Sequence, residues 1–140
     1  MIRVIPVPPE FISRAWPLTA PFIEKSFEYA AMREDLFSLY NKICRIELQL
    51  WVALKQDHCV AGAVSGIQDY SLSRVLNLPY IGGDEHSFHE WGPIAWAAFE
   101  DYAKLNNCNI IECSGRPGWG KFLGAQGLKL VAHTYEKELT

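Results

Sequence analysis

The hydrophobic period of the chain changes near residue 45, and this change constrains the fold more than any other feature. Before it, apolar residues recur at helical spacing over Pro9–Ala31, in pieces, and over Met32–Ile43. After it, Ile46–Leu54 alternates with a period of two, which is typical of a strand with two different faces. A chain that moves from helices to strands in this way predicts layers of helices packed on a sheet.

The rest of the sequence extends this pattern to ten elements. The predicted strands are Ile2–Val7, Ile46–Leu54, Val60–Ile67, Arg74–Ile81, Ile110–Cys113 and Leu130–Glu138. The predicted helices are Pro9–Ala31, Met32–Ile43, Pro93–Leu105 and Trp119–Ala125. The order β, α, α, β, β, β, α, β, α, β predicts an α/β (α+β) structure with a mixed, mostly antiparallel central sheet flanked by helices. No repeat or low-complexity linker interrupts the 140 residues, so we expect one domain over 1–140.

Short polar and glycine signals mark where several helices begin and end. Glu34 and Asp35 stand near the start of the second helix, where the helix dipole favours carboxylates. Asn106-Asn107 ends the third helix, and Gly127 is suited to a left-handed C-terminal cap of the fourth. Pro93 fits the first turn of the third helix.

Charge and composition argue against several classes of partner. The net charge of −3 provides no basic field for nucleic acid or anionic lipid. No segment approaches the roughly 20 apolar residues that span a bilayer. Pro6, Pro8 and Pro9 do not fit a signal peptide, so we expect the four cysteines to be reduced thiols in the cytoplasm. They form no C-x-x-C pair, which disfavours a zinc site. We expect no metal: His86 and His89 could share a helical face, but no further ligand follows at a fixed spacing, and a polar loop that caps a helix is favoured.

The element order and its last third resemble the GNAT N-acetyltransferase superfamily. The resemblance covers nearly the whole chain, and Gly127-Leu128 stands where such proteins usually carry Gly-Phe before the last strand. The run ECSGRPGWGKFL, residues 112–123, is also similar to a group of small GNAT-like proteins associated with bacteriophages and prophages. A phage origin would place the protein in the host cytoplasm or in the virion.

The resemblance implies a site for acetyl-CoA. GNAT proteins bind this cofactor in a V-shaped gap between the strands that correspond here to Arg74–Ile81 and Ile110–Cys113. The pyrophosphate sits at the start of the following helix, which falls between Gly82 and Pro93. The residues that this implies for cofactor binding are Leu78, Tyr80, Ile81, Gly82, Gly83, Arg116 and Trp119.

For two of these residues, the sequence supports a ligand-binding role and a purely structural role equally. Arg116 faces an anionic group of the ligand, or it pairs with a carboxylate of the chain. Trp119 packs on the ligand or anchors the short helix from within the core. The Pro117-Gly118 step between them is a turn dipeptide on chain mechanics alone.

The sequence departs from the family in two places. The usual [QR]-x-x-G-x-[GA] loop is replaced by GGDEHSFHEWGP, residues 82–93, whose Asp84, Glu85 and Glu90 would repel a diphosphate. The frequent tyrosine acid is not matched either, because Leu123 stands about four residues before the Gly-Phe position, with Phe122 beside it. Neither side chain can donate a proton.

Carboxylates on or beside the strands provide the candidate bases. Glu47 and Glu112 lie where GNAT enzymes often place the group that deprotonates the amine, directly or through water, and Asp69 is a further candidate. A strand carboxylate is more often solvated or paired with a neighbour. A backbone N–H of a strand would hold the oxyanion.

Three functions remain compatible with the sequence. The first is transfer of an acyl group from acetyl-CoA or a related acyl-CoA to an amine. The second is a catalytically degenerate GNAT-like phage protein that serves in assembly or binds a host factor. The third is self-association through the hairpin or the C-terminal strand. An open groove between the two splayed strands is expected of an enzyme, and a groove filled by Phe88 or Trp91 is expected of a binding protein. The exposed face of the hairpin could also offer Trp51 to a partner.

Overall fold

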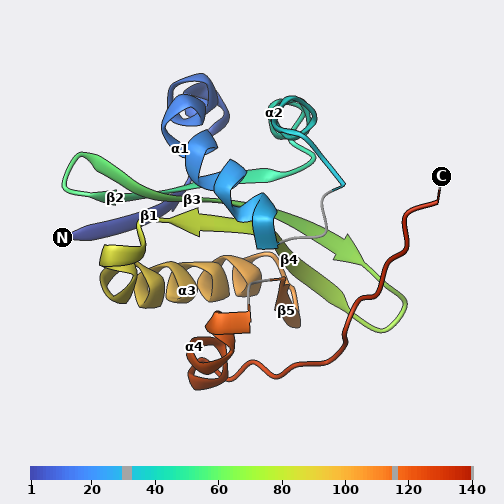
Figure 1. Ribbon diagram of the computed structural model, residues 1–140. Coiled ribbons are helices and arrows are strands. Elements are labelled where there is room, and N and C mark those ends of the chain that lie inside the picture. Colours follow the sequence, from blue (N-terminus) through green and yellow to red (C-terminus); the bar gives the residue numbers. More distant parts are fainter. Residues whose placement is uncertain (30–32, 115–116, 140) are drawn as a thin grey trace.

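The computed structural model describes residues 1–29, 33–114 and 117–139 and shows a five-stranded sheet between two layers of helices (Figure 1). The elements are β1 (Ile2–Pro6), η1 (Pro9–Phe11), α1 (Ile12–Ser26), η2 (Phe27–Tyr29), α2 (Leu36–Cys44), β2 (Gln49–Lys55), β3 (His58–Asp69), β4 (Arg74–Gly83), η3 (Glu85–Ser87), α3 (Phe88–Leu105), β5 (Ile110–Cys113), η4 (Pro117–Trp119) and α4 (Gly120–Ala125). The strands lie in the order β1-β2-β3-β4-β5, and only β4 and β5 are parallel. The predicted mixed, mostly antiparallel sheet flanked by helices is confirmed.

Two apolar cores hold the layers together. Helices α1 and α2 cover one face of the sheet, while α3 and α4 cover the other (Figure 1). On the α3 face, Trp51 is 1% exposed and packs edge-on against Phe99, with ring centroids 4.9 Å apart. Its indole N–H donates to the buried Ser65 hydroxyl over 2.9 Å. The prediction that Trp51 is available to a partner is therefore wrong, since helices cover both faces of β2.

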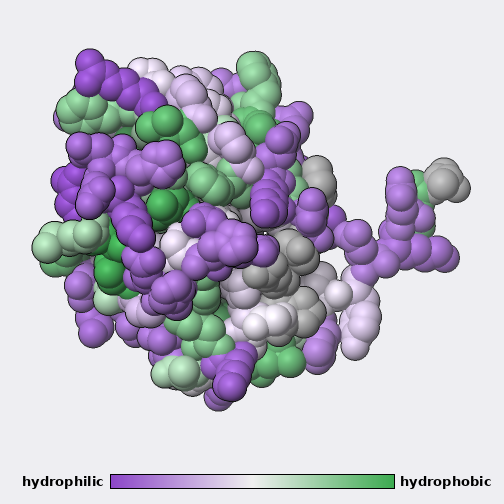
Figure 2. Space-filling view, turned by 60° about the vertical axis from the view of Figure 1, so that its left-hand side comes forward, coloured by the Kyte–Doolittle hydropathy of each residue, from purple (hydrophilic) through white to green (hydrophobic). Residues whose placement is uncertain are grey.

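The predicted strand Leu130–Glu138 is absent. Residues 128–139 have no regular secondary structure, and most of their side chains are exposed. An ion pair joins Glu136 of this segment to Arg33 of the body over 2.7 Å, with both side chains mostly in solvent. Figure 2 shows the segment projecting from the body. A period-two sequence forms a strand only when a neighbour takes up its backbone hydrogen bonds, and no described strand does so here.

The third helix begins earlier than predicted. Helix α3 starts at Phe88, so Pro93 lies inside it and not in its first turn. The missing N–H of Pro93 costs one hydrogen bond near the helix start, where the turn η3 and the buried Trp91 support the chain. No helix among the described residues combines the length and apolar character that crossing a membrane requires.

Three helices end in the same left-handed cap. In each, the residue after the C-cap has a positive φ, and the next N–H returns to the carbonyl five residues earlier. Gly127 occupies one of these positions, as predicted, and Asn107 of the predicted stop Asn106-Asn107 occupies another. The third is Ile46, with φ of 63°, and the following Glu47 N–H donates to the Lys42 carbonyl over 2.9 Å. A β-branched side chain is strained in this conformation.

Replacing Ile46 by Gly is therefore expected to raise the free energy of unfolding by about 0.5–1 kcal/mol, because the left-handed strain exceeds the entropy that glycine adds to the unfolded chain. The Ile46 side chain is 64% exposed, so little burial is lost. Urea unfolding measures the change, and Asn107→Gly is the control with a smaller expected gain. A less stable Ile46→Gly variant would contradict the strain.

Candidate functional site

The site lies where β4 and β5 part. These strands are paired in parallel from Val75 with Ile110 to Leu78 with Cys113, and β5 then ends. Strand β4 continues for five residues to Gly83. The last half of β4 therefore has β3 on one side and, in the described chain, no strand on the other.

A bulge in β4 coincides with this divergence. Val64 faces Tyr80 and Gly66 faces Asn77, so Leu78 and Pro79 together oppose the single residue Ser65. The bulge changes the side-chain phase: Leu78 points into the α3-side core and Tyr80 into the α1-side core. Proline suits the bulge because it has no N–H to give to a ladder.

Beyond the bulge, alternate backbone groups point toward the vacated edge. The Asp84 N–H donates to the Val60 carbonyl of β3 over 2.8 Å. In an antiparallel ladder the direction alternates along the strand, so Tyr80 and Gly82 also face β3. The N–H and C=O groups of Ile81 and Gly83 then point to the side that β5 has left.

A cavity occupies this place. It is lined by Lys25, Ser26, Pro79, Ile81, Gly82, Gly83, Glu85, Phe88, Trp91, Ser114 and Trp119. Its volume is about 50 Å³, which is room for a few water molecules. The cavity is bordered by backbone on the β4 side and by mostly apolar side chains on the helix side.

An aromatic cluster fills most of the space between α3 and α4. It consists of Phe88, Trp91, Trp119 and Phe122. The rings of Phe88 and Trp119 are stacked, with centroids 5.5 Å apart and an interplanar angle of 26°. Phe88 also meets Trp91 and Phe122 edge-on, at 4.9 and 5.0 Å. A ligand longer than the present cavity must displace one of these rings.

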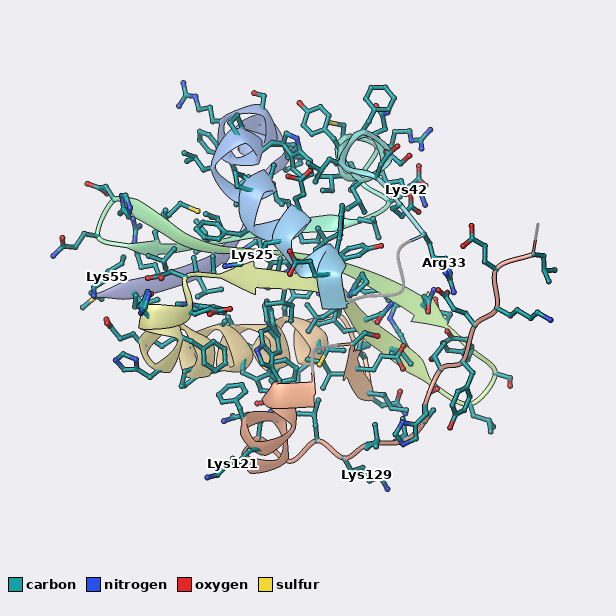
Figure 3. All side chains as sticks on the ribbon, in the orientation of Figure 1. Lys25, Arg33, Lys42, Lys55, Lys121 and Lys129 are labelled. Atoms are coloured by element: carbon teal, nitrogen blue, oxygen red, sulfur yellow. The ribbon has the colours of Figure 1, made fainter. Side chains whose placement is uncertain are left out.

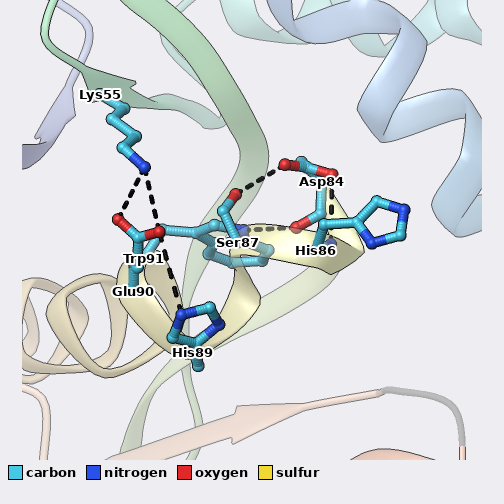
Figure 4. A network of polar contacts seen from close by, with 7 residues as sticks. All are labelled: Lys55, Asp84, His86, Ser87, His89, Glu90 and Trp91. Atoms are coloured by element: carbon cyan, nitrogen blue, oxygen red, sulfur yellow. Dashed lines mark hydrogen bonds and ion pairs between the residues drawn. The ribbon is translucent and has the colours of Figure 1, made fainter.

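The turn between β4 and α3 is held by Asp84 (Figure 4). Its carboxylate accepts hydrogen bonds from the Ser87 hydroxyl over 2.8 Å and from the His86 backbone N–H over 3.2 Å. These bonds, the one from Ser87 foremost, hold the pKa of Asp84 below its usual value. The Asp84 carbonyl accepts from the Trp91 indole N–H over 2.9 Å, which ties the turn to the aromatic cluster.

A second cavity, of about 390 Å³, lies on the α1 side of the same turn. It is lined by Phe22, Lys25, His58, Cys59, Val60, Gly83, Asp84, Glu85 and His86. Lys25 extends from α1 and borders both cavities (Figure 3). Within the described ranges, no group of three or more His, Cys, Asp or Glu residues could hold a metal ion.

The predicted cofactor residues divide between the cavity and the cores. Ile81, Gly82, Gly83 and Trp119 line the cavity. Leu78 is fully buried in the α3-side core. Tyr80 faces α1 instead, where it packs against Phe27 with centroids 5.1 Å apart and burial raises its pKa. Arg116 lies outside the described residues, as does Gly115.

The carboxylates predicted as bases lie outside the cavity lining. Glu47 follows the cap of α2 and forms an ion pair with Arg45 over 2.8 Å. Glu112 is exposed on β5 opposite Asn77, one residue before the last β4–β5 pair. Asp69 is bound to Arg74 over 2.7 Å. A catalytic role of Glu47 or Glu112 stays a prediction.

The sequence reasoning missed Pro79, Lys25 and Ser114. A proline inside a strand pattern signals a bulge and could have located the divergence. Lys25 and Ser114 carry no such local signal. Cys113 also stands at the divergence, but burial raises its pKa to about 11, so its thiol is protonated at neutral pH and is not a nucleophile.

The comparisons with known proteins agree on the architecture. No family model matches the sequence, and no curated protein matches it. Among solved structures, an aminoglycoside acetyltransferase from an uncultured soil metagenomic sample superposes with a TM-score of 0.70 at 15% identity, over 99% of this chain and 97% of the other. The chain has the GNAT fold.

Two further structures with this fold match over similar lengths. Glucosamine-6-phosphate N-acetyltransferase from Arabidopsis thaliana gives a TM-score of 0.70 at 11% identity, over 100% of this chain and 99% of the other. A predicted acetyltransferase from Clostridium acetobutylicum, solved with acetyl-CoA, gives 0.67 at 15% identity, over 99% and 96%. At such sequence identities the similarity shows the GNAT fold alone. The chemistry of this chain must be argued from its own residues.

The packing of Gly82 provides a test of why glycine is needed there. A Cβ at this position would lie 2.0 Å from the Phe22 carbonyl oxygen of α1. Gly82→Ala is therefore expected to lower the free energy of unfolding by more than about 2 kcal/mol, because backbone must move to admit the methyl group.

Gly124→Ala is the control, since a Cβ there meets nothing within 4 Å. Chemical denaturation in the absence of ligand compares the two variants. Equal stability of Gly82→Ala and the parent protein would show that β4 and α1 are not as closely packed as described.

Proposed function

We propose that the chain is an N-acyltransferase that transfers an acyl group from acetyl-CoA, or a related acyl-CoA, to an amine. The observation that carries the proposal is the vacated edge of β4. There the backbone groups of Ile81 and Gly83 face a cavity whose lining combines apolar side chains with Lys25 and Glu85. An acyl-pantetheine arm contains amides that can pair with such an edge as a short strand does.

The extent of β4 suits this arm. From Pro79 to Gly83 the strand advances about 13 Å at roughly 3.3 Å per residue. The thioester would lie at the bulge, next to Pro79 and Ser114, and the arm would run toward the turn before α3. Trp119 and Phe88 would turn aside to admit it and then cover its apolar part.

The reaction needs one base and a good leaving group. The base takes a proton from the ammonium, the amine nitrogen attacks the thioester carbonyl carbon, and the C–S bond breaks as the amide forms. The departing thiolate takes up the second proton released by the nitrogen. Glu112 is the proposed base, because it stands on β5 just before the divergence, and Glu47 is the alternative.

No acid is required at Leu123. A thiol has a pKa of about 8.5, so a thiolate leaves readily without a general acid. The absence of the family's tyrosine therefore lowers the rate of the proposed reaction less than it would with an alkoxide leaving group.

The small size of the cavity favours a second candidate function. The aromatic cluster leaves about 50 Å³, far below the several hundred that enclose a typical small ligand. If those rings do not move, the chain is a catalytically degenerate GNAT-fold protein that serves in assembly, as in a phage particle, or binds a host factor. Self-association through a sheet edge belongs to this alternative.

Calorimetric titration with acetyl-CoA separates the two functions. The proposal predicts micromolar binding that weakens at least about tenfold in Ser114→Phe, since the large ring would occupy the mouth of the cavity. Ser114 is exposed, so the substitution should leave the fold intact.

Ser71→Phe is the matched control, because Ser71 is exposed in the turn between β3 and β4, away from the cavity. Equal affinity of both variants for acetyl-CoA would place the ligand elsewhere. No heat from the parent protein at millimolar acetyl-CoA would contradict the transferase and favour the second candidate.

A further inference from the structure

The turn before α3 already contains an anion of its own. A free helix start attracts phosphate because its first N–H groups lack partners and the helix dipole is positive there. Here the Asp84 carboxylate accepts the His86 backbone N–H and the Ser87 hydroxyl. One backbone N–H and one hydroxyl of this turn are therefore engaged by a side chain of the chain itself, whereas no described side chain caps the first turn of α3.

Two further carboxylates lie near this turn, and a lysine offsets the charge of one of them. Glu85 lines both cavities, and Asp84 lines the second one, on the α1 side of the turn. Glu90, in the first turn of α3, is bound to Lys55, with nitrogen–oxygen distances of 3.0 and 2.9 Å (Figure 4). The ammonium of Lys55 is thus paired locally, and among the described residues Lys25 is the cation that borders the cavity.

The position of Asp84 in the chain determines which part of a bound donor its carboxylate would meet. Gly83 is the last residue of β4, and Asp84 follows it directly. An acyl-pantetheine arm laid along β4 from Pro79 ends beside Gly83, and in acyl-CoA the next group is the diphosphate. The two negative charges would then face the Asp84 carboxylate at short range, and their repulsion offsets the dipole of α3.

We propose that the groove recognises its donor through the acyl-pantetheine arm alone, and that Asp84 is a specificity-determining residue that turns the diphosphate away from the start of α3. This inference rests on the proposed acyltransferase function and narrows its donor. The ligand class is a pantetheine thioester whose diphosphate is either absent or left in solvent. Such an arm occurs free or attached to a carrier protein.

The experiment compares two donors that share the arm. Acetyl-pantetheine lacks the diphosphate and nucleotide of acetyl-CoA, and both are titrated calorimetrically into the full chain. We expect the two dissociation constants to agree within about threefold, whereas a bound diphosphate would favour acetyl-CoA by tenfold or more.

Asp84→Asn removes the charge and keeps the cap, because asparagine is as good an N-cap as aspartate. Acetyl-CoA should bind this variant about fivefold more tightly, as expected for the loss of one repulsion near the surface, and acetyl-pantetheine should bind within twofold of the parent. Asp101→Asn is the control: it removes the same charge from an exposed position near the far end of α3 and should change neither affinity.

An acetylated acyl carrier protein identifies the source of the arm. If the carrier protein binds, the proposal holds with a carrier-borne donor. If acetyl-pantetheine binds and the carrier protein does not, the proposal holds with a free donor. The role of Asp84 is overturned if the parent binds acetyl-CoA at least tenfold more tightly than acetyl-pantetheine and Asp84→Asn leaves the affinity for acetyl-CoA unchanged. The acyltransferase function would then still stand. Binding of neither donor overturns both.

Discussion

The site depends on one structural constraint, the short parallel pairing of β4 with β5. Four residue pairs join the strands, and the pairing stops at Leu78 and Cys113. At this point Pro79 enters β4 as part of a bulge, so the strand changes phase where it loses its neighbour. Every feature of the proposed groove follows from this divergence: the vacated edge, the cavity and the approach to α3.

The two cores keep the divergence in place. On the α3 side, Leu78 is fully buried, and Trp51 donates to Ser65, the β3 residue that faces the bulge. On the α1 side, the backbone of α1 lies so close to Gly82 that no side chain fits between them. The glycines that suggested contact with a phosphate are thus required by packing. Packing also explains the glycine at position 83, because a Cβ there would lie 2.5 Å from the Trp91 ring.

Local signals in the sequence predicted the parts of the fold that depend on local physics. The change of period at residue 45, the end of the third helix at Asn106-Asn107 and the left-handed cap at Gly127 all have short-range causes. The sequence predicts Asp35 near the start of a helix over Met32–Ile43, but α2 begins only at Leu36, and Asp35 is its N-cap, accepting from the Ser38 N–H over 2.8 Å. The strain at Ile46 gives no sequence signal, because nothing about isoleucine marks a left-handed position.

The predictions that failed concern features that depend on residues distant in the sequence. Leu130–Glu138 alternates as a strand does, but no described strand pairs with it. Trp51 looked available because the sequence does not reveal that helices cover both faces of β2. Of the residues expected to bind a cofactor, Ile81 and Trp119 line the cavity, whereas Tyr80 turns away because the bulge shifts its phase. The departures from the family pattern at Asp84 became informative only once the hydrogen bonds of that carboxylate were known.

Amide hydrogen exchange, followed by NMR with and without acetyl-pantetheine, tests the central claim most directly. If the arm pairs with the vacated edge of β4, the amides of Ile81 and Gly83 gain protection. Those of Tyr80 and Gly82 stay as they are, because they already face β3. Protection that appears at saturating ligand on other strands, or equally on all four amides, would contradict a donor bound at the divergence of β4 and β5.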